Sequence, residues 1–240
     1  MTMANFNTHL ITSAATSGVL AVGCMSGGIA SPEEVVLYFG VGTIGGLLPD
    51  LDSDNSFIIQ GFFNILGIFI AFLVMFTQVK KFSLAELLIL WFAGYFLIRY
   101  GAFHLFTKLT THRGIFHSIP AGLFFWIGTT LATTQFLGFA PLKAWLTGAF
   151  VFWGYLSHLL LDELFGVDLA NQKIKRSFGS ALKLFDSRNI PGTIILYLLV
   201  ALGLFVAPDY KSFLAIFTGG KFLTALKNNL LPRKNWFSFR

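Results

Sequence analysis

Apolar segments about as long as a membrane-spanning helix recur along most of the 240-residue chain. A helix needs about 20 apolar residues to cross the hydrocarbon layer of a bilayer. The composition agrees with this pattern, because the chain is 55% hydrophobic and only 12% charged, with a mean hydropathy of +0.72. Soluble domains carry about 25% charged residues. The chain is therefore predicted to be an integral membrane protein.

The predicted fold class is all-α, a polytopic transmembrane bundle of about six to seven spans. The expected helices cover residues 9–30, 33–48, 57–79, 84–106, 119–137, 142–164 and 190–207. Residues 1–208 would form one membrane-embedded domain that carries a metal site. Residues 209–240 space apolar side chains among lysines, which predicts a basic amphipathic tail at the membrane interface.

Four short polar islands lie at the ends of these apolar segments. They contain four of the five histidines and comprise His9, Asp50-Leu51-Asp52, His112 to His117, and His158 to Asp162. If the predicted helices alternate across the bilayer, all four islands fall on the same side. Ionisable side chains at membrane depth are costly, and most of them serve function. We therefore expect the islands to form one site.

The island at the end of the sixth predicted helix pairs His158 with Asp162. On a helix this spacing of four residues stacks the two side chains on one face, about 5–6 Å apart at their Cβ atoms. The pair suits two ligands of one metal ion, or one histidine ligand oriented by a carboxylate. The structural alternative is a buried ion pair.

The second island concentrates Asp50, Asp52 and Asp54 within five residues. Carboxylates this close resist joint ionisation unless a cation neutralises them. A capped turn between helices would explain Asp54. It would not require Asp50 and Asp52, which we therefore include among the candidate metal ligands.

The third island places His112 and His117 around a glycine. Neutral imidazole is the commonest metal ligand in proteins. Between the two histidines, Arg113 offers a planar guanidinium fork for a phosphate or carboxylate. The structural alternative is an ordinary positive loop with incidental histidines.

The islands together supply more ligands than one catalytic ion needs. The candidate ligands are His9, Asp50, Asp52, His112, His117, His158 and Asp162. A catalytic zinc takes three protein ligands and keeps an open position, whereas this set suits two ions about 3.5–4 Å apart that share a carboxylate. Mixed nitrogen and oxygen ligands fit Zn²⁺ or Mn²⁺ without choosing between them, and Mg²⁺ is a further alternative. The single cysteine, Cys24, excludes a cysteine-rich zinc site.

The order of the islands resembles the YdjM-like family. A histidine near the N-terminus precedes Leu48-Pro49-Asp50-Leu51-Asp52, His112-Arg113-Gly114-Ile115-Phe116-His117-Ser118 and Ser157-His158-Leu159-Leu160-Leu161-Asp162. Members are described as LexA-regulated inner-membrane, metal-dependent hydrolases, and the resemblance covers roughly residues 1 to 190. The family is distantly similar to zinc-dependent phospholipase C and P1-type nucleases, whose His and Asp ligands hold several metal ions. This chain lacks their full ligand set, which leaves the number of ions open.

The leading functional hypothesis is a hydrolase that cuts a lipid phosphoester at the bilayer surface with metal-activated water. Asp50 or Asp52 would bridge the ions, and Arg113 would hold the substrate phosphate. The expected partners are the bilayer and a lipid substrate, with no nucleic acid. One alternative is a transporter of metal ions or protons, although such pathways usually line several depths. Another is a non-catalytic membrane protein with a structural metal.

The orientation of the site depends on the positive-inside rule. The island-bearing face would hold Lys108, Arg113, Lys173, Lys175, Arg176, Lys183 and Arg188, against Lys80, Lys81 and Lys143 opposite. This difference favours a cytoplasmic site in the bacterial inner membrane. The tail nearly cancels the difference if residues 190–207 also cross, because it adds Lys211, Lys221, Lys227, Arg233, Lys234 and Arg240 to the opposite side.

Overall fold

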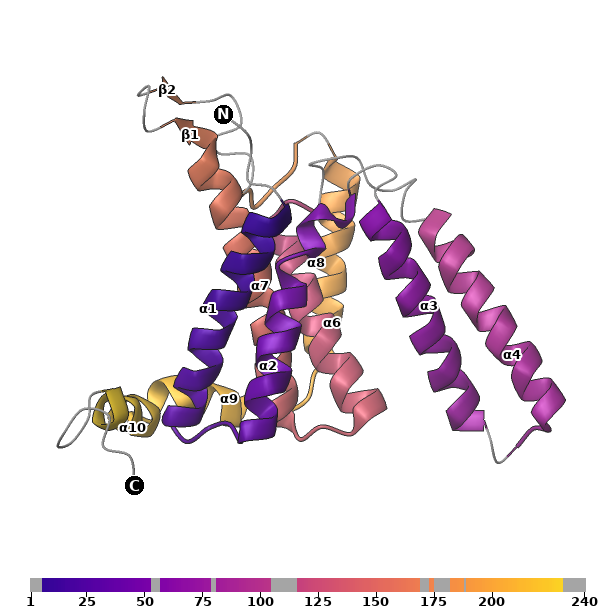
Figure 1. Ribbon diagram of the computed structural model, residues 1–240, viewed down its shortest axis with the longest axis horizontal. Helices are drawn as coiled ribbons and strands as arrows, with labels where there is room; N and C mark the ends of the chain where they lie inside the picture. The colour runs from indigo at the N-terminus through magenta and orange to yellow at the C-terminus, as the bar shows by residue number, and fades with distance from the viewer. Residues whose placement is uncertain are drawn as a thin grey trace. The chain divides into compact units, whose positions relative to one another are not determined.

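The computed structural model of the chain describes residues 6–52, 57–78, 81–104, 116–168, 173–174, 182–187 and 189–230. These residues are almost entirely helical (Figure 1), which confirms the all-α part of the predicted fold class. The short strands β1 (Val167–Asp168) and β2 (Lys173–Ile174) form one antiparallel pair. The chain divides into two compact units, one made of Met1–Pro49 and His117–Arg240 and the other of Asp50–Phe116.

The first unit is a helix bundle built around one long helix. Its helices are α1 (Phe6–Ser26), α2 (Pro32–Gly45), α6 (Ile119–Leu137), α7 (Pro141–Gly166), α8 (Ile190–Phe205), α9 (Lys211–Thr218) and α10 (Lys221–Leu230). Helix α7 contacts α1, α2, α6 and α9, and α8 packs against α6 (Figure 1). Long-range packing around α7 therefore fixes which helix ends meet.

Helix α2 begins where its sequence predicts. The Ser31 hydroxyl accepts a hydrogen bond from the Glu34 amide, and the Glu34 carboxylate accepts one from the Ser31 amide at 2.9 Å. This capping box satisfies two amides that a helix start leaves unpaired. The helix ends at Gly45, earlier than expected, and a 3-10 turn, η1 (Leu48–Asp52), follows. Asp50 therefore lies in a tight helical turn.

Small residues let α1, α2 and α7 approach one another closely. A Cβ atom added to Gly42 would collide with Ser17, and one added to Gly46 would collide with Ser13. A Cβ atom on Gly154 would overlap the Gly42 carbonyl oxygen. Such close backbone contacts are typical of helix pairs in membranes. The glycines of the second predicted helix thus allow it to pack closely against α1 and α7.

Replacing Gly154 with alanine is expected to destabilise the bundle by about 1–3 kcal/mol, because the added methyl group overpacks the α2–α7 contact. Gly128→Ala on α6 is the matched control, since a Cβ atom there meets nothing within 4 Å. The control should be neutral or slightly stabilising, because alanine favours helix over glycine by about 1 kcal/mol. Thermal unfolding in detergent compares the two variants. Equal midpoints would contradict the close contact.

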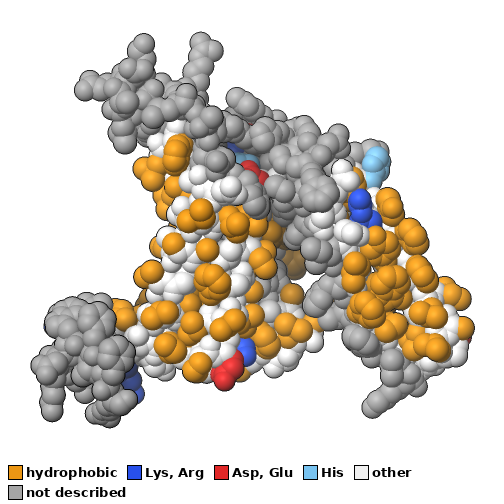
Figure 2. Space-filling view, in the orientation of Figure 1, with side chains coloured by type: hydrophobic (Ala, Val, Ile, Leu, Met, Phe, Trp, Pro, Cys, Tyr) orange, Lys and Arg blue, Asp and Glu red, His pale blue; other side chains and the backbone are white. Residues whose placement is uncertain are grey.

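Three helices in the described residues are long and apolar enough to cross a membrane. They cover Asn7–Ser26, Leu84–Ala102 and Pro141–Phe165, and the shorter Ile190–Phe205 is also apolar. The predicted six to seven spans are thus not confirmed. Large apolar side chains such as Leu198, Leu202 and Phe205 are exposed on α8, and others cover the helices in Figure 2. Exposed apolar surface of this kind marks contact with lipid.

The second unit is a helical hairpin. Helix α3 (Phe57–Gln78) packs against α4 (Leu84–Phe96), which continues into the π-helical turn η2 (Leu97–Ala102). Gly94 lies against the backbone of Ala71, and the Tyr95 hydroxyl donates a hydrogen bond to Asn64 Oδ1 at 2.5 Å. These contacts hold the two helices together.

The described part of the C-terminal tail packs on the first unit. Helix α9 buries Phe213 and Ile216 in the hydrophobic core beside Trp145. The Trp145 indole N–H also donates a hydrogen bond to the Pro208 carbonyl oxygen at 3.1 Å. The apolar face of α9 therefore lies on the bundle.

Candidate metal centre

Four ionisable side chains from three segments meet at one end of the first unit. His9 lies in the first turn of α1, His117 lies just before the N-cap residue of α6, and His158 and Asp162 lie in the last turns of α7. The histidine residues are 2%, 3% and 0% exposed, and the Asp162 side chain is 13% exposed. Three buried imidazoles around one carboxylate need a chemical reason, because buried polar groups are costly without partners.

The Asp162 carboxylate lies at the centre of this group. Its Oδ1 atom is 3.4 Å from His9 Nε2, and its Oδ2 atom is 3.6 Å from both His117 Nε2 and His158 Nε2. These separations are long for hydrogen bonds. They match the edges of a zinc-centred tetrahedron, about 3.3–3.4 Å for metal–ligand bonds of about 2.0–2.1 Å. This spacing could accommodate a shared cation.

The backbone of α2 fixes how His158 presents its ring. His158 Nδ1 lies 2.7 Å from the Gly46 carbonyl oxygen. A carbonyl oxygen can only accept, so Nδ1 carries the hydrogen and donates it. In the neutral ring Nε2 then bears the lone pair and faces Asp162. Metal-ligating histidines show this arrangement, with the second ring nitrogen bonded to a carbonyl or carboxylate.

A cation between His158 Nε2 and the Asp162 carboxylate would remove the repulsion between them. The His158 Nε2 lone pair and the Asp162 carboxylate are both acceptors, so they repel unless a proton or metal ion neutralises the contact. The His9 ring stacks on the His158 ring with centroids 3.6 Å apart and planes 13° apart. Protonating both rings would place two like charges at that distance. A divalent ion serves both rings and the carboxylate at once.

The geometry therefore fits a metal ion. One ligand atom each from His9, His158 and Asp162 lies within 4.8 Å of the others. His117 joins the group with its ring centroid 5.8 Å from that of His158 and the two ring planes 72° apart. Imidazole nitrogens with a carboxylate oxygen form a ligand set that zinc and related ions accept. These side chains could hold a divalent cation.

The segment that carries His117 has a support that sequence reasoning missed. The Ile119 amide donates a hydrogen bond to the Lys183 carbonyl oxygen at 3.1 Å, and Ser118 forms a parallel bridge with Lys183. Lys183 also pairs with the buried Asp186, Nζ to Oδ2 2.9 Å. The segment around Lys183 thus holds the start of α6 in place. The number of basic residues in this segment does not indicate that its backbone contacts Ser118 and Ile119.

The remaining candidate residues are Asp50, Asp52, His112 and Arg113. Asp50 is the first residue of the second unit and follows Pro49, whose side chain is fully buried. The Asp52 backbone ends η1, but its side chain is outside the described residues. His112 and Arg113 are also outside them. The structure therefore brings together His9, His117, His158 and Asp162 of the predicted set.

A family model of the YdjM inner membrane protein matches residues 3–170. The chain belongs to the YdjM inner membrane protein family. This match confirms the resemblance inferred from the order of the polar islands, and its span contains every candidate ligand. The YdjM match and the apolar helices together identify a membrane protein. No curated protein and no solved structure matches the chain.

Proposed function

We propose that the protein is a membrane-bound, metal-dependent hydrolase that cleaves a phosphoester bond of a lipid. One observation carries the proposal: His158 is held by the Gly46 carbonyl with Nε2 toward Asp162, between two other buried imidazoles. The fixed tautomer of His158 and its convergence on the Asp162 carboxylate support metal binding over a simple ion pair. A membrane-embedded site suits a substrate that stays in the bilayer.

The proposed ligands divide into two sets. His9, His117, His158 and Asp162 would hold one ion, with Zn²⁺ as the first candidate and Mn²⁺ or Mg²⁺ as alternatives. Asp50, Asp52 and His112 would supply the second. Chain connectivity supports the role of Asp50, because it lies four residues after Gly46, and four residues span at most about 14 Å.

The protein's own side chains would then orient the substrate. When bound, divalent ions supply Lewis acidity and lower the pKa of a nearby water. The proposed role of Asp50 or Asp52 is to bridge the two ions, and both are the proposed catalytic carboxylates. Arg113 would hold the substrate phosphate through its planar fork. Burial of the three histidines keeps bulk water from competing with these contacts.

The proposed topology places the site at the cytoplasmic face. Helices α1, α2, α3, α6, α7 and α8, together with α4 and η2, would cross the bilayer. Two observations support this arrangement: the first unit brings His9 and Asp162 to one end, and the loops that precede α8 carry more basic residues on the predicted island-bearing face than on the opposite face. The positive-inside rule then favours the cytoplasm.

Metal removal tests the proposed activity. The purified protein would be assayed in mixed micelles against phosphatidate, phosphatidylglycerol and lipid pyrophosphates, before and after treatment with a chelator. We expect phosphate or headgroup release that the chelator reduces at least about 100-fold and that Zn²⁺ or Mn²⁺ restores. Metal flux into proteoliposomes without any hydrolysis would contradict the proposal and favour a transporter.

A further inference from the structure

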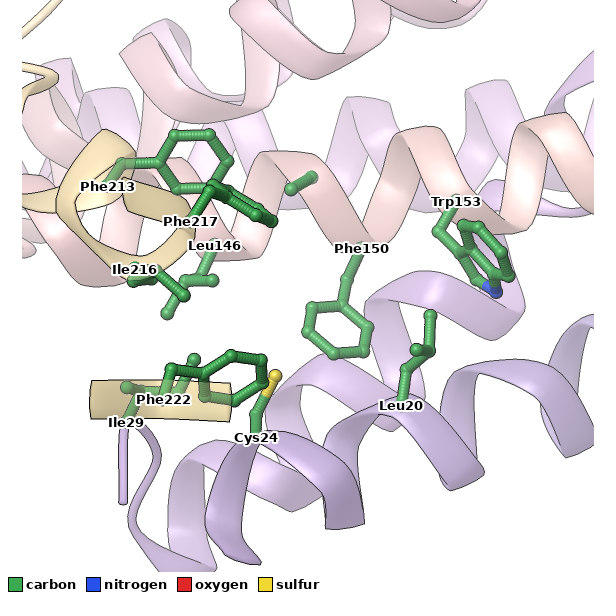
Figure 3. A pocket seen from close by; sticks show the side chains of 11 residues that line it. Leu20, Cys24, Ile29, Leu146, Phe150, Trp153, Phe213, Ile216, Phe217 and Phe222 are labelled. Atoms are coloured by element: carbon green, nitrogen blue, oxygen red, sulfur yellow. The ribbon is translucent and has the colours of Figure 1, made fainter. Parts of the chain in front are cut away.

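A second candidate lipid site lies at the other end of the first unit. A cavity of about 290 Å³ opens between α1, α7, α9 and α10 (Figure 3). Its volume is close to the lower end of small-ligand sites, which is about 300 Å³. Cys24 lines it and lies fifteen residues after His9 on α1, which places it roughly 22 Å from the metal centre. The cavity is therefore separate from the candidate metal centre.

The cavity has an almost wholly apolar lining. Phe150 of α7 faces Leu20 and Cys24 of α1, and aromatic rings of α9 and α10 lie at the end near Leu146 (Figure 3). The polar lining groups are the Cys24 thiol and the Trp153 indole N–H. Both α1 and α7 are long and apolar enough to span a bilayer. Between two membrane-spanning helices, such an apolar lining would contact lipid. A hydrocarbon chain would bury the apolar surface of the lining.

Specific contacts hold the wall of the cavity in place. The Phe222 ring lies directly over Gly27, where any Cβ atom would collide with it. Asn229 Nδ2 donates a hydrogen bond to the Ser26 carbonyl oxygen at 2.8 Å. That carbonyl is one of those that the C-terminus of α1 leaves without an intrahelical partner. Helix α10 is thus docked onto the end of α1 by both packing and hydrogen bonding.

The charged residues beside the cavity favour an anionic lipid headgroup. Residues 210–230 contain Lys211, Lys221 and Lys227 and no acidic residue. Basic residues on an amphipathic helix attract anionic lipid headgroups at the interface. Phe213 and Phe222, each close to one of these lysines in sequence, line the cavity. The surface therefore combines a cavity for a chain with positive charge for its headgroup.

We propose that this cavity binds one acyl chain of an anionic phospholipid at the membrane face opposite the metal centre. The inference does not depend on the proposed hydrolase activity. Its site uses none of the candidate metal ligands, so either inference can fail alone.

Filling the cavity tests the proposal. Ala149→Phe places a ring among the lining residues, whereas Ala132→Phe makes the same change on the exposed face of α6. Native mass spectrometry in micelles doped with dioleoyl phosphatidylglycerol should show one retained lipid on the wild type and on Ala132→Phe. Retention should fall at least about fivefold on Ala149→Phe. Equal retention by the two variants, or equal retention of dioleoyl phosphatidylcholine, would overturn the proposal.

The single cysteine gives a second measurement that needs no variant. A chain in the cavity would cover Cys24, so phosphatidylglycerol should slow its alkylation by N-ethylmaleimide at least about threefold. Phosphatidylcholine should slow it less. An alkylation rate that neither lipid changes would contradict occupancy of the cavity, even if the filled variant fails to fold.

Discussion

Replacing Asp162 with asparagine is expected to remove most of the bound metal and to lower turnover at least about 100-fold. The carboxylate faces His9 through one oxygen and His117 and His158 through the other. The amide has the same shape but no charge, and it presents only one acceptor atom. Metal content and lipid hydrolysis of the purified variant measure the effect.

The neighbouring acid provides the control. Glu163→Gln removes the same charge one residue later on α7, where Glu163 makes none of the three contacts that Asp162 makes with His9, His117 and His158. We expect this variant to keep its metal and its activity. Thermal unfolding of both variants should stay close to that of the wild type, since neither changes a packed apolar group. Full metal binding by Asp162→Asn would show that the carboxylate is structural.

Asp50→Asn is expected to remove one of two ions while the other stays bound. Asp50 belongs to the proposed second ligand set, whereas His9, His158 and Asp162 of the first set all lie in the first unit. Turnover should fall by about two orders of magnitude, because a two-metal site needs both ions to stabilise the attacking and leaving oxygens. Metal stoichiometry by elemental analysis measures this step directly.

Asp54→Asn is the matched control for that variant, because the sequence predicts a turn cap at this position, which needs no metal. It should leave both the stoichiometry and the turnover unchanged. Unchanged stoichiometry in Asp50→Asn would restrict the site to a single ion held by His9, His117, His158 and Asp162. Equal loss in the two aspartate variants would instead indicate a general charge effect.

Helix positions could be predicted from the sequence because membrane helices have long apolar runs and clear caps. The Ser31–Glu34 capping box and the apolar residues 190–207 are local signals, and the structure has α2 and α8 there. The apolar pattern predicts that this helix ends at residue 48, but α2 ends at Gly45. The apolar pair Leu47-Leu48 continues the hydrophobic pattern, whereas the backbone turns into η1 before the proline at residue 49.

The grouping of ligands was partly predictable for a similar reason. The spacing of His158 and Asp162 predicts that they share one helix face. The alternation of helices across the bilayer predicts that the islands share one side, and neither prediction requires knowledge of how the helices pack. The Gly46 carbonyl could not be found this way, because a backbone acceptor has no sequence signature. The support of His117 by Lys183 depends on long-range packing, and the docking of Phe213 on the bundle does too.

Metal analysis of the purified wild-type protein tests the central claim most directly. Elemental analysis after purification without chelator or added metal should find at least one divalent ion per chain, and two if Asp50 and Asp52 complete the site. The ion should be lost in Asp162→Asn. A stoichiometry near zero in the wild type, unchanged after incubation with Zn²⁺, Mn²⁺ or Mg²⁺ and removal of the excess, would contradict the account.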